Sequence, residues 1–257
     1  MSGDRTPGLS ALVVAHNEEA QLPGCLAQLT FADEIVVVLD RCTDKSLEIA
    51  QAAGARILEG AWPLEGTRRN AGIAACEGPW VLEVDADERV PDKLAQEVRR
   101  TIATATPGYF LIKFDNYIGD RLVRYGWGAY NGASAGPRLF TKGSKEWGEQ
   151  LVHPKITLEG PRRWLETPID HYVDKDVSDM IARFDRYTTA RAADLRASGD
   201  IGSLANNLRR IISRFWKSYV SRKGYREKHF GLLLGLFSAT YPLVSYLKAK
   251  IAEEEGR

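Results

Sequence analysis

The residues most suggestive of chemistry are two aspartates, Asp85 and Asp87, that directly follow the apolar run 80–84. If that run is a strand of a parallel sheet, both carboxylates lie at the crevice where open α/β sheets bind ligands. Carboxylate oxygens suit Mg²⁺ or Mn²⁺ held through substrate phosphates, and such an ion stabilises charge on a leaving diphosphate. The competing interpretation is that acidic residues merely end a strand and cap the next helix. This motif alone leaves the two interpretations even.

Two other expected strand ends carry polar side chains. They are residues 15–19 (AHNEE) and residues 40–44 (DRCTD). Such side chains offer acceptors for the N–H groups of a base and for ribose hydroxyls. The other interpretation is local, because Glu18 suits the N-terminus of a helix and Thr43 can cap one. Asp40 fits that local interpretation least, since it precedes the cap.

Two arginines, Arg68 and Arg69, follow in the segment 66–72 (GTRRNAG). Their guanidinium groups can pair with phosphate oxygens in the same crevice. Arginines on a helix more often form a solvated face, however. The segment therefore supports a phosphate-binding site only in combination with the acidic motifs.

The elements that must position these side chains follow from the pattern of apolar residues. Short β-branched runs without alternation are typical of strands buried on both faces of a parallel sheet. We predict strands at 9–15, 34–39, 55–58 and 80–84, helices at 18–29, 43–54 and 66–75, and a further helix opened by Pro91. This order indicates a doubly wound α/β sheet. Strand-like pieces in 108–171 predict an antiparallel extension that builds the second half of the site.

The composition fits a chain with one large core. At 257 residues, with 44% hydrophobic and 27% charged residues, its net charge of +1 gives no overall indication of partners. The three cysteines form no Cys-x-x-Cys pair and predict buried thiols in a reducing compartment. Residues 1–8 lack a basic region followed by an apolar run, so we expect no secretory signal and a cytoplasmic location.

The C-terminal third has a different character. A helix is expected up to Gly199, and a second helix over 204–221 is both amphipathic and basic. Residues 209–228 hold eight basic side chains against Glu227 alone, and the uncharged stretch 230–247 is borderline for a membrane span. We favour a segment lying in the interface of an anionic membrane over helices that pack back on the rest of the chain.

The motifs AHNEE, VVVLDRCTDKS, GTRRNAGI and EVDADE, in this order and spacing, resemble the inverting glycosyltransferases of family two. The later segments RLFTKG, LVHPKI, IDHYV, RYTTARAADL and RFWKSYVSRKGY are similar to the bacterial group that adds glucose-type sugars to the lipopolysaccharide inner core. The resemblance covers residues 9–248. It implies a GT-A type α/β fold with a catalytic domain at 9–173 and a helical region at 174–250. The catalytic domain divides into a nucleotide-sugar half at 9–90 and an acceptor half at 108–173.

The same resemblance implies roles for the residues singled out above. The expected assignments are Ala15, His16 and Glu18 at the nucleoside, Asp40 at the base, Arg68 near the nucleotide, Asp85 near the ribose and Asp87 on the metal. The cofactor implied is a divalent metal, Mn²⁺ or Mg²⁺.

An inverting transfer also needs a group that takes the proton of the acceptor hydroxyl as its oxygen attacks the anomeric carbon. Where the resembling group has a His-Glu pair, this chain has His153-Pro154. Glu149 is the first candidate for the base and His153 the second, against a surface charge and a structural histidine. His171 near the metal, and Trp127 and Tyr130 stacked on a sugar, are weaker hypotheses, because such residues also serve structural roles.

These observations predict a metal-dependent inverting hexosyltransferase. It moves a sugar, glucose-type by resemblance, from a UDP-sugar to a lipid-anchored saccharide of lipopolysaccharide core or another cell-envelope glycan. Expected partners are the donor, the lipid-linked acceptor and an anionic membrane surface on the inner face of the cytoplasmic membrane, with no nucleic acid. The alternatives are a polyprenyl-phosphate glycosyltransferase, a non-catalytic surface-binding protein, and a nucleotidyltransferase, against which the lack of a Gly-rich phosphate loop counts.

Overall fold

The computed structural model describes residues 8–128, 132–149 and 155–256. The chain divides into two compact units: the first comprises residues up to Phe114 and Ala135–His171, and the second comprises Asp115–Ser134 and Tyr172–Arg257. Strands β6 (Tyr109–Ile118) and β12 (Ile169–Asp174) each contribute residues to both units. The segment 115–134, expected in the acceptor half of the catalytic domain, thus groups with the C-terminal helices.

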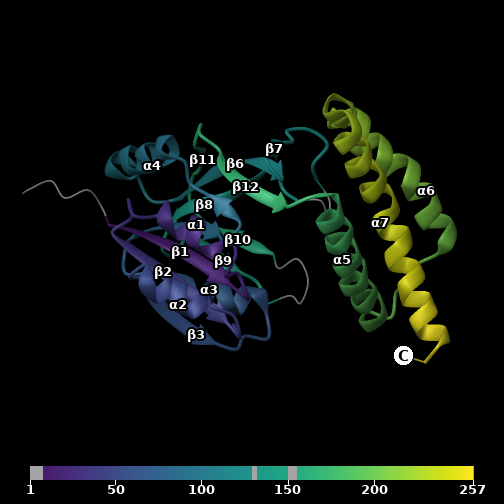
Figure 1. Cartoon of the computed structure of the whole chain (residues 1–257), viewed down its shortest axis with the longest axis horizontal. Coiled ribbons are helices and arrows are strands. Elements are labelled where there is room, and N and C mark those ends of the chain that lie inside the picture. Colours follow the sequence, from purple (N-terminus) through teal and green to yellow (C-terminus); the bar gives the residue numbers. More distant parts are fainter. Residues whose placement is uncertain (1–7, 129–131, 150–154, 257) are drawn as a thin grey trace, which may run out of the picture. The chain divides into compact units, whose positions relative to one another are not determined.

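Strands and helices alternate along the first part of the chain (Figure 1). The elements are β1 (Leu9–Ala15), α1 (Leu22–Ala27), β2 (Glu34–Asp40), α2 (Ser46–Ala52), β3 (Arg56–Gly60), α3 (Glu65–Ala75), β4 (Trp80–Asp85), β5 (Glu88–Arg89), α4 (Asp92–Thr104), β8 (Ala135–Thr141), β9 (Lys145–Trp147), β10 (Ile156–Leu158) and β11 (Arg162–Trp164). The main sheet has the order β3-β2-β1-β4-β8-β6-β12-β5. The first four strands are parallel, and β8 runs antiparallel to β4. The predicted doubly wound sheet and its antiparallel extension are confirmed.

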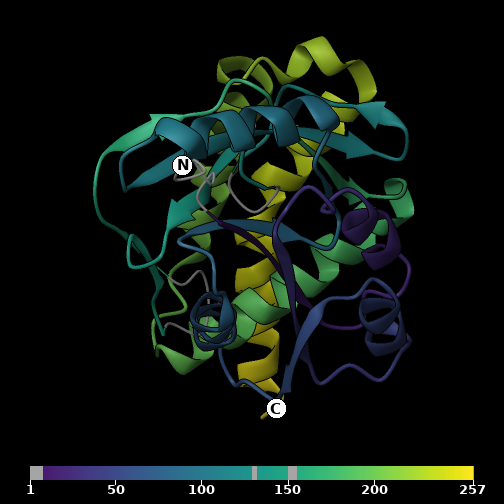
Figure 2. The same cartoon turned by 90° about the vertical axis from the view of Figure 1, so that its left-hand side faces the viewer.

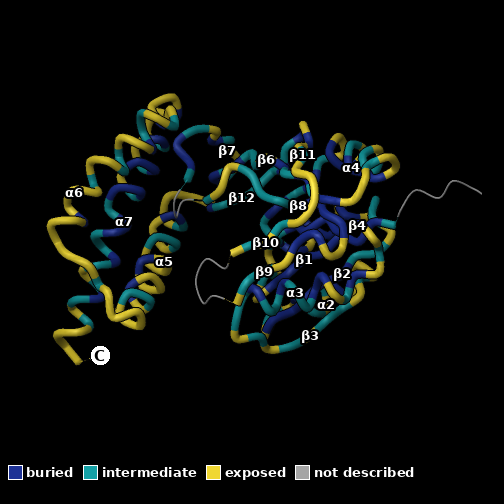
Figure 3. The backbone as a smooth tube through the Cα atoms, turned by 180° about the vertical axis from the view of Figure 1, so that it is seen from behind, coloured by how far each residue is buried: buried dark blue, intermediate teal, exposed yellow. Residues whose placement is uncertain are grey.

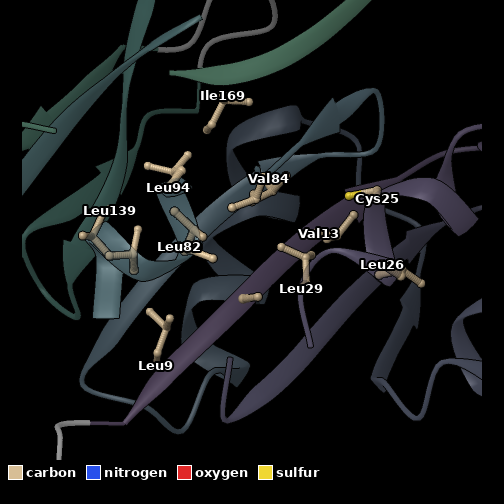
Figure 4. Packing of buried hydrophobic residues seen from close by; sticks show 14 of the residues in the cluster. Leu9, Val13, Cys25, Leu26, Leu29, Leu82, Val84, Leu94, Leu139 and Ile169 are labelled. Atoms are coloured by element: carbon tan, nitrogen blue, oxygen red, sulfur yellow. The ribbon is translucent and has the colours of Figure 1, made fainter. Parts of the chain in front are cut away.

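Strand β1 is buried on both faces, which explains its run of apolar residues. Leu9 and Val13 belong to a cluster with residues of α1, α2 and α4. Figure 4 shows Val13 near Leu29, which belongs to the segment that follows α1. Leu12 and Val14 point the other way and pack with residues of α3. Figure 2 shows α3 across the strands from α1 and α2, as right-handed crossovers require.

The first predicted helix is shorter than expected. Residues 18–29 were predicted to be helical, but α1 begins only at Leu22, with Pro23 in its first turn. The preceding residues form a turn in which Gln21 N donates to Glu18 O. Proline is favoured in the first turn, where its missing N–H costs nothing, so it marks the start of α1 rather than its interior. The other predicted helices of this unit are confirmed to within a few residues.

The second unit is mainly helical. Its elements are β7 (Arg121–Leu122), α5 (Val177–Ala197), α6 (Leu204–Phe215), a π-helical turn (Trp216–Ser221), a 3₁₀ turn (Gly224–Glu227) and α7 (Lys228–Glu254). Helix α7 contacts both α5 and α6 along its length (Figure 1). Gly199, which was predicted to end a helix, follows α5 with a φ of +69°, where glycine is favoured.

Candidate active site

The carboxyl ends of the parallel strands meet at one edge of the sheet. The register places Val14 opposite Asp85, Ala15 opposite Leu39, and Asp40 opposite Gly60. The loops that follow β1, β2 and β4 are therefore neighbours. The residues predicted for the nucleotide and the metal gather along this edge: Ala15, His16, Glu18, Asp40, Arg68, Asp85 and Asp87.

Hydrogen bonds join the first two of these loops. His16 Nδ1 donates to the carbonyl oxygen of Asp40 at 2.5 Å, since a carbonyl can only accept. Thr43 N donates to Asn17 Oδ1 at 2.8 Å. Asn17 and Arg41 have φ values of +57° and +51°. Such left-handed residues cost about 1–2 kcal/mol, and they cluster at functional sites where surrounding contacts hold them in place.

Asp40 is buried and its carboxylate is fully hydrogen-bonded. It accepts from Arg41 Nε at 2.9 Å and Nη2 at 2.8 Å, from Trp62 N at 3.1 Å, and from Arg68 Nη1 at 3.1 Å. Burial raises the pKa of Asp40, but the hydrogen bonds from Arg41 and Trp62 outweigh it and hold the pKa below its ordinary value. Asp40 and Arg68 thus form one ion pair. A base N–H that reaches Asp40 must take a position now held by the half-exposed Arg41 side chain.

Asp85 lies between two arginines. Its Oδ1 accepts from Arg69 Nη1 at 2.9 Å, and its Oδ2 accepts from Arg138 Nη2 at 2.5 Å. Burial raises the pKa of Asp85, but the charges of Arg138 and Arg69 lower it far below its usual range. Both carboxylate oxygens are therefore occupied, which favours a positioning role for Asp85 over direct contact with a metal.

Five more charged side chains surround Asp85 in a buried ion cluster. Its acids are Glu83, Asp85 and Glu88, and its bases are Arg69, Arg138 and Lys145. Glu83, without exposed surface, accepts from Arg69 Nη1 at 2.6 Å and from Lys145 Nζ at 2.8 Å. Arg138 also donates to Glu88. Because buried charges are tolerated only when paired, the equal numbers of acids and bases let the cluster stay inside the fold.

This cluster predicts an acid-sensitive component of stability. Burial raises the pKa of Glu83, but the charges of Lys145 and the neighbouring arginines outweigh it and lower the pKa from its ordinary 4.5 to about 2. Ionised Glu83 therefore contributes stability that is complete above pH 4.5 and is lost as the pH falls toward 2. We expect Glu83→Gln to flatten the fall in unfolding free energy across that window, measured by urea unfolding. The exposed Glu59→Gln is the control, and an equally steep fall in Glu83→Gln would contradict the assignment.

Asp87 has no ion pair with the arginines of the cluster among the described residues, and its side chain is 37% exposed. Its Oδ2 lies 3.4 Å from His171 Nε2. The pairing of β5 with β12 sets His171 opposite Glu88, one residue from Asp87. Burial lowers the pKa of His171, but its contact with Asp87 outweighs this and raises it. Of the two aspartates, Asp87 is thus the one whose carboxylate is not held by arginines, while the exposed fractions of the two side chains are similar, at 37% for Asp87 and 27% for Asp85.

Asp87 and His171 fit a divalent metal that completes its shell with phosphate oxygens. In the described part of the chain, no group of three or more His, Cys, Asp and Glu side chains is arranged to hold a metal. Mg²⁺ and Mn²⁺ bound to nucleotides need only one or two protein ligands, and an imidazole beside a carboxylate favours Mn²⁺. Burial, followed by the charge of Asp87, raises the pKa of Glu18.

The candidates for a general base fall partly outside the described residues. His153 and Tyr130 lie among the residues that the structure does not describe. Glu149 is exposed and follows β9, where Asn70 of α3 exchanges two hydrogen bonds with the backbone of Trp147, at 2.8 and 2.9 Å. The end of β9, two residues before Glu149, is therefore fixed by hydrogen bonds to α3. The stacking hypothesis for Trp127 is wrong, because its side chain is buried in the second unit and its Nε1 donates to Val123 O.

Sequence reasoning assigned no role to Glu83, Arg138 or Lys145. Glu83 was one charge in the apolar strand WVLEV, and a charge at a position buried on both faces must have a cationic partner. The charged residue therefore predicts a cationic partner but does not identify it. Arg138 belongs to β8 and Lys145 to β9, and both strands are far from Glu83 along the chain.

Comparison with known proteins identifies a family for this chain. A family model described as Glycosyl transferase family 2 matches residues 10–153. The lipopolysaccharide core biosynthesis glycosyltransferase LpsC of Rhizobium meliloti is 28% identical over 209 residues, which cover 74% of this chain and 73% of that protein.

Solved structures agree with the fold. TarS 1–349 of S. aureus superimposes with a TM-score of 0.51 at 14% identity, over 97% of this chain and 92% of that chain. Glucosyl-3-phosphoglycerate synthase from Mycobacterium tuberculosis, solved with Mn²⁺ and UDP, is 24% identical with a TM-score of 0.37, and this chain spans only 44% of its length. The likeness to TarS and the family match confirm the predicted GT-A type fold.

Proposed function

The chain belongs to glycosyl transferase family 2, and from this premise we propose that it transfers a sugar from a UDP-sugar to a lipid-anchored saccharide, with inversion at the anomeric carbon. The observation that carries the proposal is the meeting of the Asp40–Arg68 pair, the clamped Asp85 and the open Asp87–His171 pair at one sheet edge. The likeness to LpsC supports an acceptor in lipopolysaccharide core, or in another cell-envelope glycan. Within this proposal, the donor sugar is of the glucose type.

The donor is proposed to lie along the loops that follow β1, β2 and β4. Ala15, His16 and Glu18 contact the nucleoside. Asp40 accepts a hydrogen bond from the base, with Arg68 beside the nucleotide, and Asp85, fixed by its two arginines, receives the ribose hydroxyls. These contacts use acceptors and a cation. Because such groups are already held in place by the protein, less conformational entropy is lost when the donor binds.

Asp87, joined by His171, is proposed to hold Mn²⁺ or Mg²⁺. When bound, the ion supplies positive charge that stabilises the diphosphate leaving group. His171 also orients Asp87, since their side chains are already in contact at 3.4 Å. The sequence hypothesis that placed His171 near the metal is thereby retained as part of the proposal.

Proton removal from the acceptor is assigned to Glu149 first and to His153 second. The acceptor oxygen forms its bond to the anomeric carbon from the face opposite the diphosphate, while the bond from that carbon to the diphosphate oxygen breaks. The acceptor proton passes to the carboxylate of Glu149, and UDP leaves. A carboxylate that is exposed at a strand end can reach an acceptor that arrives from outside the fold.

A screen of UDP-sugars tests this proposal. We expect release of UDP that requires Mn²⁺ or Mg²⁺, stops with EDTA, and is stimulated by detergent-solubilised lipopolysaccharide core. Glu149→Gln is expected to lower this stimulated rate about a hundredfold, whereas the exposed Glu146→Gln leaves it unchanged. Stimulation by a polyprenyl phosphate alone would replace the proposed acceptor. No turnover or metal-dependent binding with any nucleotide sugar would overturn the transferase assignment and leave a non-catalytic binding protein.

A further inference from the structure

Helix α6 and the π-helical turn after it carry an apolar stripe that none of the described residues of the second unit covers. Leu204, Leu208, Ile212 and Trp216 recur every four residues, so they lie on one side of the helix. Their exposed fractions lie between 46% and 77%, the highest belonging to Ile212. Figure 3 shows α6 largely exposed, in contrast to the central part of α7. Large apolar side chains scattered singly need no explanation, but a continuous row of four does.

The stripe is additional to the apolar face with which α6 packs on α7. Phe215 lies against Gly235 of α7, where a Cβ would meet its ring at 3.0 Å, and it stacks on Tyr219 at 5.2 Å. Asn207 is buried on this inner side. The apolar arc of α6 is therefore wider than α7 can cover. Packing within the unit accounts for one part of that arc and leaves the stripe without a partner.

Basic side chains lie on the polar side of α6. Arg209, Arg210 and Lys217 are exposed. At 100° per residue, Arg209 lies at the edge of the stripe beside Trp216, whereas Arg210 and Lys217 lie on the side of the helix opposite the stripe. The segment 201–226 contains no acidic residue. Glu227, which follows it, is buried and accepts hydrogen bonds from the backbone N–H groups of residues 124 and 125. The charged side chains of the segment 201–226 are thus all basic, and the exposed Asp200 directly precedes it.

Helix α7 satisfies the length and composition of a membrane span, and part of it packs within the second unit. The candidate span covers Gly224–Glu254, and 39% of its most apolar window is buried within the protein. Its buried positions include the small residues Gly235, Ser238 and Ser245, on a helix that contacts both α5 and α6. Its apolar character is only partly used for this packing, because large side chains remain 41–45% exposed at Leu232, Leu236 and Leu247.

We propose that the stripe, together with the basic side of α6, forms a surface that lies in the interface of an anionic lipid bilayer. The four apolar side chains enter the acyl boundary, Arg209 at the edge of the stripe contacts lipid phosphates, and Arg210 and Lys217 add positive charge that attracts the anionic surface. Charge decides against a second copy of this chain as the occupant, since a two-fold contact would bring like charges together. The inference rests on the proposed function in that it gives access to a lipid-linked acceptor.

Vesicle sedimentation tests this surface. Wild type is expected to sediment with vesicles of phosphatidylglycerol and phosphatidylcholine, less so with phosphatidylcholine alone, and less at high salt. The double variant Ile212→Ser/Trp216→Ser is expected to bind about tenfold more weakly or worse. Ile181→Ser on α5, at a position 53% exposed, is the matched control and should bind as wild type does. Replacing Arg209, Arg210 and Lys217 with glutamine should remove the preference for anionic vesicles.

Three outcomes overturn the inference. Wild type that stays in the supernatant, or a double variant that binds like Ile181→Ser, excludes this surface once circular dichroism shows that the variants are folded. A wild-type dimer that the double variant converts to a monomer identifies a second copy as the occupant. UDP release with solubilised acceptor should be unchanged in the double variant. Vesicle binding without any UDP release would keep this inference and overturn the proposed function.

Discussion

Asp87→Ala is expected to lower metal-dependent UDP release about a thousandfold or more, while the free energy of unfolding changes by less than about 1 kcal/mol. Asp87 is the carboxylate at the sheet edge that no arginine holds, and its Oδ2 lies 3.4 Å from His171 Nε2. Removing it takes away a metal ligand without exposing a core. Mn²⁺ binding in the presence of UDP, measured by calorimetry, should weaken in parallel.

The matched control for Asp87→Ala is Asp92→Ala, which removes an exposed aspartate from the first turn of α4. It should leave both Mn²⁺ binding and UDP release at wild-type levels. An Asp87→Ala protein that keeps full activity would exclude Asp87 as the ligand. If instead Asp85→Ala alone removed metal binding, the clamped aspartate would be the ligand.

Arg138→Met is expected to lower the free energy of unfolding by about 3–5 kcal/mol, the largest stability effect predicted for this chain. Arg138 donates to both Asp85 and Glu88, and it lies 3.7 Å from Glu83. Burial raises the pKa of Glu88 to about 7 even with Arg138 present. Without the guanidinium, these carboxylates remain in a buried region with too few cations. Urea unfolding at neutral pH measures the loss.

Arg99→Met is the control for Arg138→Met. Arg99 pairs with Asp33 at 2.6 Å, but both side chains are partly exposed, so this pair should contribute no more than about 1 kcal/mol. Arg138→Lys should recover part of the stability, because it restores one positive charge but not the two-pronged donor. A loss in Arg138→Met no larger than that in Arg99→Met would show that the ion cluster tolerates an unpaired acid.

The strands of the first ninety residues were predictable because local pattern decides them. The run 80–84 is apolar, apart from Glu83, because both faces of β4 are covered. Parallel strands joined by right-handed crossovers have their carboxyl ends at the same edge, so Asp85 and Asp40 had to be neighbours. The α1 boundary was less predictable, since Pro23 and the turn before it compete with the apolar spacing.

The partners of those side chains were not predictable from local pattern. Arg138 lies 53 residues from Asp85 along the chain and reaches it only because β8 runs antiparallel beside β4. His171 reaches Asp87 because β12 pairs with β5. Neither strand pairing can be recognised from the residues around the acidic motif at Asp85 and Asp87. The burial of Trp127 was not predictable from local pattern either, because it depends on packing in the second unit.

The sequence by itself determined the α/β alternation, the family and the acidic edge, because burial on both faces and strand direction act through neighbouring residues. It also determined that the C-terminal third is basic and apolar. Only the tertiary structure decided that Asp85 is clamped while Asp87 stays open, and which side of α6 is exposed. The physical reason is that a side chain's charge partners and its solvent exposure depend on elements contributed from elsewhere in the chain.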